Sequence, residues 1–245
     1  MNRLCLPGAT LGSGLSLHLA GEEAHYILRV LRLRKGDGIF IFDGAGNEYE
    51  AVLETAERGS AFLRLGRAVK RNTEPLVRIS LAQALPRGDK MDLIIQKCTE
   101  IGVAEILPFS SARGIPRVKE ITQAGRLSRW RRIACEAAEQ SQRVFIPEVA
   151  EITALDQIAE SIGSYDLSLV AWEDSIEPLK TVWGRINRGA HSILLVVGPE
   201  GGFTIEEIEL LRSYGALDIS LGSRILRTET AGMVLAALTV YEMDS

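Results

Sequence analysis

Short alternating patterns of apolar and polar positions run through the first seventy residues of the chain. They occupy Ile39–Phe42, Glu48–Ala56 and Ala61–Val69, and turn-forming residues separate them. Alternation with a period of two is typical of strands that bury one face, whereas Glu22–Leu33 has helical spacing. The pattern predicts a small barrel or half-barrel of antiparallel strands with one helix, followed by a polar linker at Lys70–Pro75.

From Leu76 onward, apolar runs of strand length alternate with longer helical periods. The strand-like runs are Val77–Leu85, 104–109, Asp166–Trp172, Ser192–Val197 and Leu217–Leu221. Two helices are indicated by apolar stripes, at Met91, Ile94, Ile95, Cys98 and Ile101, and at Leu127, Trp130, Ala134 and Ala137. Alternation of strands and helices predicts an α/β domain built mostly on a parallel sheet.

Composition places the chain among ordinary globular proteins. Its 245 residues are 46% hydrophobic and 24% charged, which suits one large domain or two small ones. Apolar runs such as Ile193–Val197 are far shorter than the ~20 residues that cross a bilayer. Nothing at the N-terminus resembles an export signal. The cysteines Cys5, Cys98 and Cys135 lie far apart, so we expect no metal site, no disulfide and a cytoplasmic location.

Charge is distributed unevenly along the chain, whose net charge is -4. Residues 1–147 hold 22 Lys/Arg and 16 Asp/Glu, whereas residues 148–245 hold 6 and 16. An anionic partner meeting the first half would suit this balance, and a solvated surface of uneven charge would explain it equally well.

The run "LLVVGPEGGFTIEEIELL", Leu194–Leu211, reads as a strand, a glycine-rich loop and a helix. Such loops often hold phosphate at the helix start. Here Thr204 and Glu207 have the spacing of a capping box, and Phe203 and Ile208 that of a hydrophobic staple. The acidic residues nearby and the lack of a nucleotide-binding glycine motif also disfavour phosphate. A neutral adenosine or a cationic group would be tolerated; a tight turn with no ligand is the alternative.

A second loop, within Leu221–Leu238, places Ile225 and Leu226 between Arg224 and Arg227. A surface loop seldom needs two large apolar residues between two arginines, whereas a loop folded around a ligand does. A C-terminal core helix after an ordinary turn would explain the later residues but leaves the arginines without a role.

The motifs "GPEGG" and "LGSRILRTETA" resemble the two C-terminal signatures of the ribosomal RNA small-subunit methyltransferase E family. The resemblance extends to "HYILRVLRLRKGD" and "IFDGAGNEYEA" near the N-terminus, and to "RGDKMDLIIQKCTEIGVAEILPFSSAR" and "RWRRIACEAAEQSQR" in the middle. In this order and spacing the motifs are highly specific.

The resemblance implies a fold that pattern reasoning does not supply. It implies a PUA-like RNA-binding β-barrel domain at residues 1–72 and a SPOUT α/β domain with a parallel sheet and a deep trefoil knot at residues 73–245. It also implies a homodimer that transfers a methyl group from S-adenosylmethionine to N3 of one uridine in small-subunit ribosomal RNA. Threaded chains are rare, so the strand and helix pattern alone would have predicted an unknotted topology.

Site residues follow from the same match. The cofactor loops would contain Gly198, Pro199, Glu200, Gly201, Gly202, Leu221, Gly222, Ile225, Leu226, Arg227 and Thr228. Arg227 is the leading catalytic candidate, because its permanent charge and donor fork suit charge on a uracil carbonyl. Glu229 would accept the N3 proton or orient Arg227.

The RNA surface would combine basic residues of both halves: His25, Arg29, Arg32, Arg34, Lys35, Arg87, Lys90, Arg113 and Arg117. Arg143 could reach either RNA or the active site of a partner subunit. His25 could be proposed as a base, but among neighbouring arginines an RNA-contacting or structural role is favoured.

Three other functions stay open at this point. A related knotted methyltransferase with another target would share the cofactor loops but should lack the N-terminal motif and the "RTETA" end. A non-catalytic RNA-binding assembly protein would have no reason to bind S-adenosylmethionine. A conventional nucleotide-dependent α/β enzyme is disfavoured by the capped, acidic loop.

Overall fold

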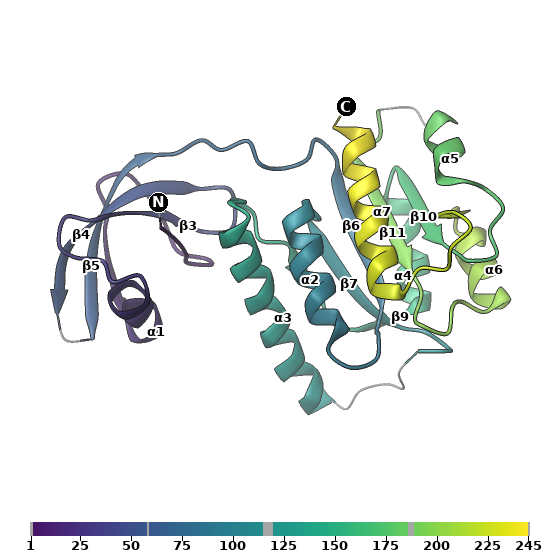
Figure 1. Cartoon of the computed structure of the whole chain (residues 1–245), viewed down its shortest axis with the longest axis horizontal. Coiled ribbons are helices and arrows are strands. Elements are labelled where there is room, and N and C mark those ends of the chain that lie inside the picture. The colour runs from purple at the N-terminus through teal and green to yellow at the C-terminus, as the bar shows by residue number, and fades with distance from the viewer. Residues whose placement is uncertain (1, 58, 115–119, 186–188, 245) are drawn as a thin grey trace. The chain divides into compact units, whose positions relative to one another are not determined.

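The computed structural model of the chain describes residues 2–57, 59–114, 120–185 and 189–244. The chain divides into two compact units (Figure 1). The first contains residues 1–74 and 138–146, and the second contains residues 75–137 and 147–245. A short segment from the middle of the chain therefore belongs to the N-terminal unit.

The first unit is built on a curled five-stranded sheet. In spatial order its strands are β1 (Arg3–Cys5), β3 (Gly38–Phe42), β4 (Glu48–Glu57), β5 (Ser60–Ala68) and β2 (Ser16–Ala20). β1 and β3 pair in parallel, and the other neighbours are antiparallel. Alternate residues such as Ile39, Ile41 and Leu53 are buried in one core, which is what the period-two pattern predicts.

The helix expected at Glu22–Leu33 ends at Val30, and its second half is a π-helix, which is wider than an α-helix. An α-helix, α1, covers Gly21–His25, and a π-helix, η1, covers Tyr26–Val30. The amide of Leu31 donates to the carbonyl of Tyr26, five residues earlier, at 2.9 Å. Arg32 then adopts a φ of 55°, which ends the helical backbone.

Arg3 attaches β1 to the segment 138–146. Its Nε donates to Glu48 Oε1 at 2.8 Å, and its other nitrogens donate to the carbonyls of Ala138, Glu139 and Arg143 at 3.3, 3.0 and 3.0 Å. The side chains of Arg3 and Glu48 are only 5% and 0% exposed. Because a buried charge is tolerated only when it is paired and hydrogen-bonded, this cluster requires every one of its members.

The second unit contains a seven-stranded sheet in which all paired strands are parallel. In spatial order its strands are β12 (Leu217–Ile219), β10 (Leu167–Ala171), β11 (Ser192–Val197), β6 (Arg78–Ala84), β7 (Glu105–Ser110) and β8 (Glu148–Val149), and β9 (Thr153–Ala154) also pairs with β7. This confirms the α/β class with a parallel sheet.

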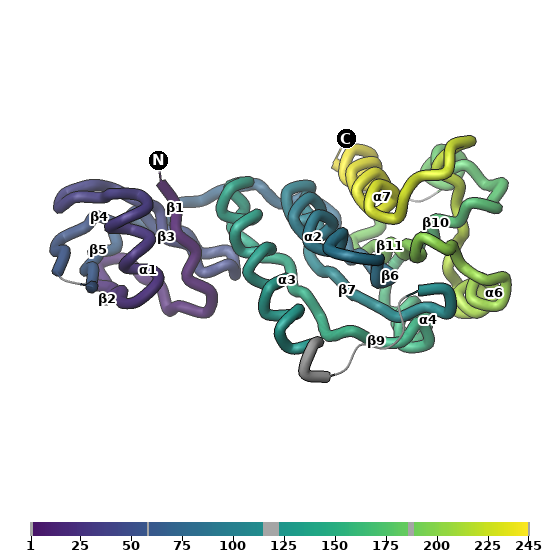
Figure 2. The backbone as a smooth tube through the Cα atoms, turned by 60° about the horizontal axis from the view of Figure 1, so that its bottom comes forward, coloured from purple at the N-terminus to yellow at the C-terminus, as the bar shows by residue number. Residues whose placement is uncertain are grey.

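Helices cover both faces of this sheet. They are α2 (Lys90–Ile101), α3 (Glu120–Gln140), α4 (Leu155–Ser161), the short 3-10 helix η2 (Ile162–Ser164), α5 (Leu179–Arg185), α6 (Ile205–Ser213) and α7 (Thr228–Met243). α2 and α7 lie side by side in both views (Figures 1 and 2). Gly232 of α7 lies against Leu81 and Gln83 of β6, whereas Ala82 and Ala84 belong to the core beneath α4 and α6.

Each strand expected from an apolar run is present within two residues of its predicted bounds. The missed elements are mainly short ones, including the two-residue strands β8 and β9. Of the second helical stripe, Trp130, Ala134 and Ala137 are buried as expected. Within the described ranges, no helix combines the length and the apolar character that spanning a membrane requires.

Replacing Arg3 should destabilise the first unit. We expect Arg3→Met to lower the free energy of unfolding by about 3 kcal/mol, because Glu48 would keep its buried charge with one cation fewer. The matched control is Arg64→Met, since Arg64 is 57% exposed and pairs with Glu54 at the surface. That change should cost less than about 1 kcal/mol in urea denaturation. Equal losses would contradict the structural role of Arg3.

Candidate functional site

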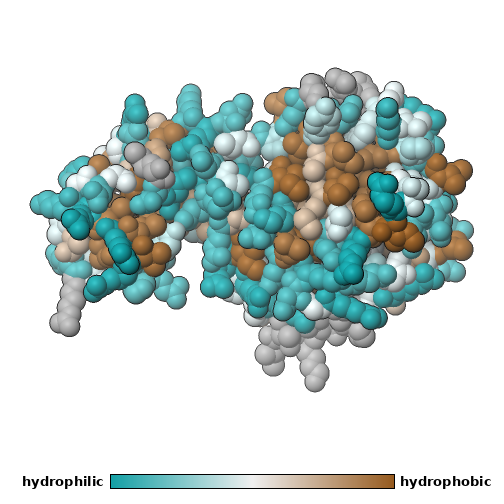
Figure 3. Space-filling view, viewed as in Figure 1, coloured by the Kyte–Doolittle hydropathy of each residue, from teal (hydrophilic) through white to brown (hydrophobic). Residues whose placement is uncertain are grey.

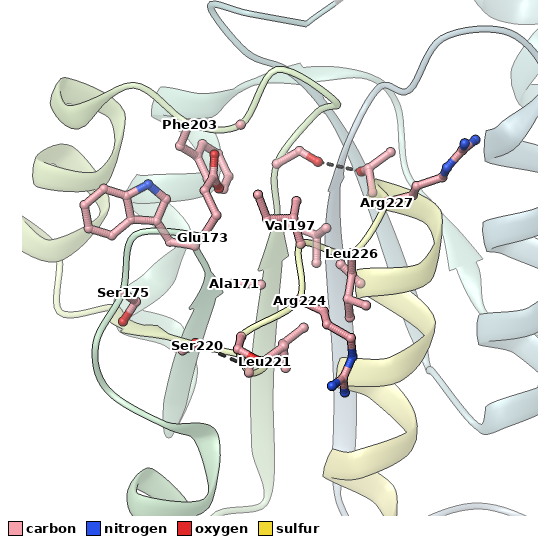
Figure 4. A pocket seen from close by; sticks show the side chains of 18 of the residues that line it. Ala171, Glu173, Ser175, Val197, Phe203, Ser220, Leu221, Arg224, Leu226 and Arg227 are labelled. Atoms are coloured by element: carbon pink, nitrogen blue, oxygen red, sulfur yellow. Dashed lines mark hydrogen bonds between the residues drawn. The ribbon is translucent and has the colours of Figure 1, made fainter.

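A cavity of about 580 Å³ opens where three neighbouring parallel strands end. The loops after β10, β11 and β12 line it, with residues drawn from 171–178, 197–203 and 220–228. Figure 4 shows Ala171 and Val197 at the strand ends, with side chains of the three loops around them. In open α/β sheets, ligands bind outside the carboxyl ends of the strands, so this cavity has the position of a ligand site.

Gly202 allows a carboxylate to lie against the glycine loop. Its φ is 68°, and a methyl group built at this position would lie 2.0 Å from Glu173 Oε1. Its amide donates to the carbonyl of Pro199 at 3.0 Å, which closes the turn. A side chain at position 202 would be excluded by both backbone conformation and space.

The start of α6 is closed by a capping box of its own residues. Glu207 N donates to Thr204 Oγ1 at 3.2 Å, and Thr204 N donates to Glu207 Oε2 at 2.9 Å, so the predicted capping box is confirmed. The other oxygen of Glu207 accepts from the amide of Ala112 at 2.7 Å. Phe203 and Ile208 are buried in one core, as a staple requires. The amides of Thr204 and Glu207 are therefore already satisfied and are not available to a phosphate.

The hydroxyl of Thr228 connects two loops of the cavity to the sheet. Thr228 Oγ1 donates to the carbonyl of Gly198 at 2.5 Å and accepts from Gln83 Nε2 at 2.9 Å. Gln83 Nε2 also donates to the carbonyl of Ala84 at 3.1 Å. Gln83 is fully buried, so this chain of hydrogen bonds is shielded from water.

Glu200 has two donors from the connection between β6 and α2. Lys90 Nζ donates to its Oε1 at 2.9 Å, and the amide of Arg87 donates to the same oxygen at 3.0 Å. Burial alone would raise the pKa of Glu200, but the hydrogen bonds outweigh it and the pKa is lowered. The hydrogen bond with Glu200 raises the pKa of Lys90. Glu200 is therefore an ionised group whose charge is already neutralised.

Arg227 and Glu229 lie at the start of α7. The carbonyl of Arg227 accepts from Ala231 N at 2.8 Å, which makes Arg227 the N-cap residue. Its exposed side chain extends away from Glu173 and Phe203 (Figure 4). The side chain of Glu229 is 13% exposed, and Lys90 Nζ lies 3.3 Å from its Oε2. In the described parts of the chain, Glu229 pairs with Lys90 rather than with Arg227.

Comparison with known proteins identifies the domains that carry this site. Residues 72–240 match the model of an RNA methyltransferase domain, and residues 19–66 match that of an RNA methyltransferase PUA domain. The chain is 33% identical to the ribosomal RNA small subunit methyltransferase E of Bacillus subtilis over 231 residues, covering 92% of this chain and 90% of the relative. The chain belongs to the ribosomal RNA small subunit methyltransferase E family.

Two further relatives in the family support the assignment. The Synechocystis enzyme of the same name is 37% identical, over 89% of this chain and 71% of its own. The solved structure of the Neisseria gonorrhoeae enzyme bound to S-adenosyl methionine superposes with a TM-score of 0.88 at 33% identity, covering 98% of this chain and 96% of that one.

Most residues that the family motifs nominated for the cofactor surround the cavity. They are Gly198, Pro199, Glu200, Gly202, Leu221, Gly222, Ile225, Leu226, Arg227 and Thr228. Gly201 does not line it: its carbonyl accepts from Arg113 Nη1 at 3.2 Å. Ile225, expected as an apolar wall, is 86% exposed and lies at the rim.

The basic residues proposed for RNA fall into several environments. In the first unit, exposed positions on α1, η1 and the turn after them hold His25, Arg29, Arg32, Arg34 and Lys35. In the second unit, Arg87 and Arg113 are exposed, and Arg117 lies outside the described residues.

Two of the basic residues have structural partners instead of a free surface. Arg143 is 2% exposed, and its Nε donates to Glu74 Oε2 at 3.0 Å within the first unit. Lys90 is held between Glu200 and Glu229. The surface role expected of Arg143 therefore has no exposed guanidinium to support it.

Sequence reasoning missed Glu173, Ile176 and Gln83. The first two follow β10, and the carboxyl ends of parallel strands share one edge of the sheet, so "AWEDSI" after a predicted strand was the available signal. The signal for Gln83 was a single polar residue inside the apolar run "ISLAQAL".

Removing the hydroxyl of Thr228 should destabilise the unit that contains the cavity. We expect Thr228→Val, which keeps the side-chain shape, to lower the free energy of unfolding by about 1–3 kcal/mol, because the carbonyl of Gly198 and one donor of Gln83 lose their partner. Thr228→Ser keeps the hydroxyl and loses only one methyl group, so it should lower the free energy of unfolding by about 0.8 kcal/mol. Chemical denaturation of both variants measures the difference. A serine variant as unstable as the valine variant would contradict this role.

Proposed function

We propose that this protein transfers a methyl group from S-adenosylmethionine to N3 of one uridine in small-subunit ribosomal RNA. The observation that carries the proposal is the cavity at the ends of β10, β11 and β12, bounded by both family motifs, with Arg227 at its edge. Related enzymes are named for methylation of small-subunit ribosomal RNA, and the gonococcal relative binds S-adenosyl methionine.

The residues around the cavity fit this cofactor. Its volume of about 580 Å³ is within the range of small-molecule sites. Leu221, Leu226 and Val197 offer apolar walls to an adenine ring, and the open space beside Gly222 lets a ligand approach the backbone. When bound, the cofactor supplies an electrophilic methyl group.

The uridine needs help that Arg227 and Glu229 are suited to give. N3 carries a proton between two carbonyl groups and is a poor nucleophile until that proton leaves. An arginine stays charged and can stabilise the negative charge that then spreads onto a carbonyl oxygen. We assign this task to Arg227, whose side chain has no hydrogen-bond or ion-pair partner competing for its donors among the described residues. Glu229, which follows Arg227 by two residues at the start of α7, would accept the proton as a general base.

Basic residues in both units would bind the RNA backbone. Phosphate contacts supply most of the affinity that does not depend on sequence. The exposed group on α1, η1 and the following turn, together with Arg87 and Arg113, supports this assignment. The substrate would place the protein in the cytoplasm.

The architecture belongs to the proposal as well. We infer a PUA-like RNA-binding barrel at residues 1–72 and a SPOUT domain with a deep trefoil knot at residues 73–245, in line with the matched family models. A homodimer is supported by Leu93 on α2 and by Leu238 and Tyr241 on α7, which are 42%, 43% and 74% exposed. Figure 3 shows apolar side chains gathered over the second unit on the face where α7 lies in Figure 1. Such exposed apolar surface is typical of interfaces.

Arg227→Ala should abolish methylation and leave cofactor affinity largely intact. The lost charge stabilisation acts on the RNA base, and a catalytic donor of this kind contributes about 10²–10³-fold in rate. Methyl transfer to ribosomal RNA and calorimetric binding of S-adenosylmethionine measure the two effects separately. Arg185→Ala is the control, because Arg185 is 70% exposed on α5 and does not line the cavity. Turnover of the Arg227 variant at the unmodified rate would refute the assignment.

Cells that lack this protein should lose 3-methyluridine from their small-subunit ribosomal RNA. Nucleoside mass spectrometry of the purified RNA measures it, and reintroducing the gene should restore the modified nucleoside. Retention of 3-methyluridine in the deletion strain would overturn the proposed target.

A further inference from the structure

Glu173 is a carboxylate at the cavity that has no charged partner among the described residues. It follows β10, is exposed, and lines the cavity. Figure 4 shows its side chain extending from the end of β10 toward Phe203, and the absence of a side chain at Gly202 gives its Oε1 the space it occupies. No hydrogen bond or ion pair joins Glu173 to another residue of the described chain.

The other charged groups at the cavity do not balance this carboxylate. Glu200 is paired with Lys90, which it shares with Glu229. Arg224 and Arg227 both extend away from Glu173 (Figure 4). Both arginines line the cavity but lie away from Glu173, so at its own end of the cavity this carboxylate favours a cation over a neutral ligand of the same shape.

We propose that Glu173 makes the cavity prefer the sulfonium cofactor, S-adenosylmethionine, over its neutral product, S-adenosylhomocysteine. This inference rests on the proposed function. S-adenosylmethionine carries a net positive charge because of its sulfonium, whereas the two ligands share the adenosine and the amino acid group. Glu173 is thus a specificity residue that senses the charge by which substrate and product differ.

The preference assists release of the product. In the transfer, the bond between sulfur and the methyl carbon breaks and a bond between uridine N3 and that carbon forms. Sulfur keeps the bonding electron pair and becomes a neutral thioether, and the N3 proton leaves to a base. The attraction of Glu173 for the ligand ends with the same step, so the spent cofactor is held less tightly than the fresh one.

Calorimetric titration of both ligands into the full-length protein tests the inference without any turnover. We expect Glu173→Gln to raise the dissociation constant for S-adenosylmethionine about three- to tenfold, since the pair is partly exposed to solvent, and to change that for S-adenosylhomocysteine less than about twofold. The loss should shrink as salt is raised, because salt screens the attraction. Asp174→Asn is the matched control: it removes the same charge from the adjacent residue, which does not line the cavity. It should leave both constants nearly unchanged.

Each contrary result has a separate meaning. Equal weakening of both ligands by Glu173→Gln would overturn the inference, because Glu173 would then contact a group that they share, such as the ribose hydroxyls. No change for either ligand, or an equal effect of Asp174→Asn, would overturn it too. A wild-type protein that binds neither ligand would overturn the proposed function itself. Circular dichroism of each variant shows whether the fold is retained.

Discussion

The hydroxyl of Thr228 is the point on which the arrangement of the cavity depends. It donates to the carbonyl of Gly198 and accepts from the buried amide of Gln83, so the loop after β11, the start of α7 and strand β6 are joined through one atom. Because Gln83 is fully buried, its amide cannot exchange this bond for a hydrogen bond to solvent. Gly232 leaves the space that Gln83 needs, since a methyl group there would lie 2.9 Å from Gln83 Oε1. The two family motifs are thus joined directly by Thr228, and Gln83, which belongs to neither, anchors Thr228 to the sheet.

The carboxylates near the cavity differ in their roles, and the role of each follows from its hydrogen-bond or ion-pair partners. Glu207 caps α6 and holds the amide of Ala112. Glu200 is neutralised by Lys90 and fixes the glycine loop to the connection after β6. Glu229 shares the same lysine. Only Glu173 faces the cavity without a partner in the described chain. The same carboxylate group therefore caps a helix, fixes a loop or attracts a charged ligand, depending on the groups beside it.

Apolar periodicity predicted most strands of both sheets and the parallel α/β class, because a strand inside a sheet must be apolar wherever it is buried. The capping box at Thr204 was equally predictable, since its two partners are three residues apart and the interaction is local. The prediction of a helix at Glu22–Leu33 was wrong in its extent, because the π-helical turn and the positive φ of Arg32 cannot be recognised from the spacing of apolar residues. Residues 138–146 belong to the first unit through Arg3, a contact across more than a hundred residues that no local pattern encodes.

The sequence by itself determined the family motifs, the two loops that bound the cavity, the cap of α6 and the elements of the parallel sheet. These features depend on neighbours within a few positions or on an ordered set of motifs. Only the tertiary structure decided that Lys90 pairs with Glu200 and Glu229, that Arg143 is buried against Glu74, and that Glu173 lies at the cavity unpaired. The reason is physical: the role of a charged side chain is set by the opposite charges and the solvent around it, and those come from parts of the chain that only folding brings together.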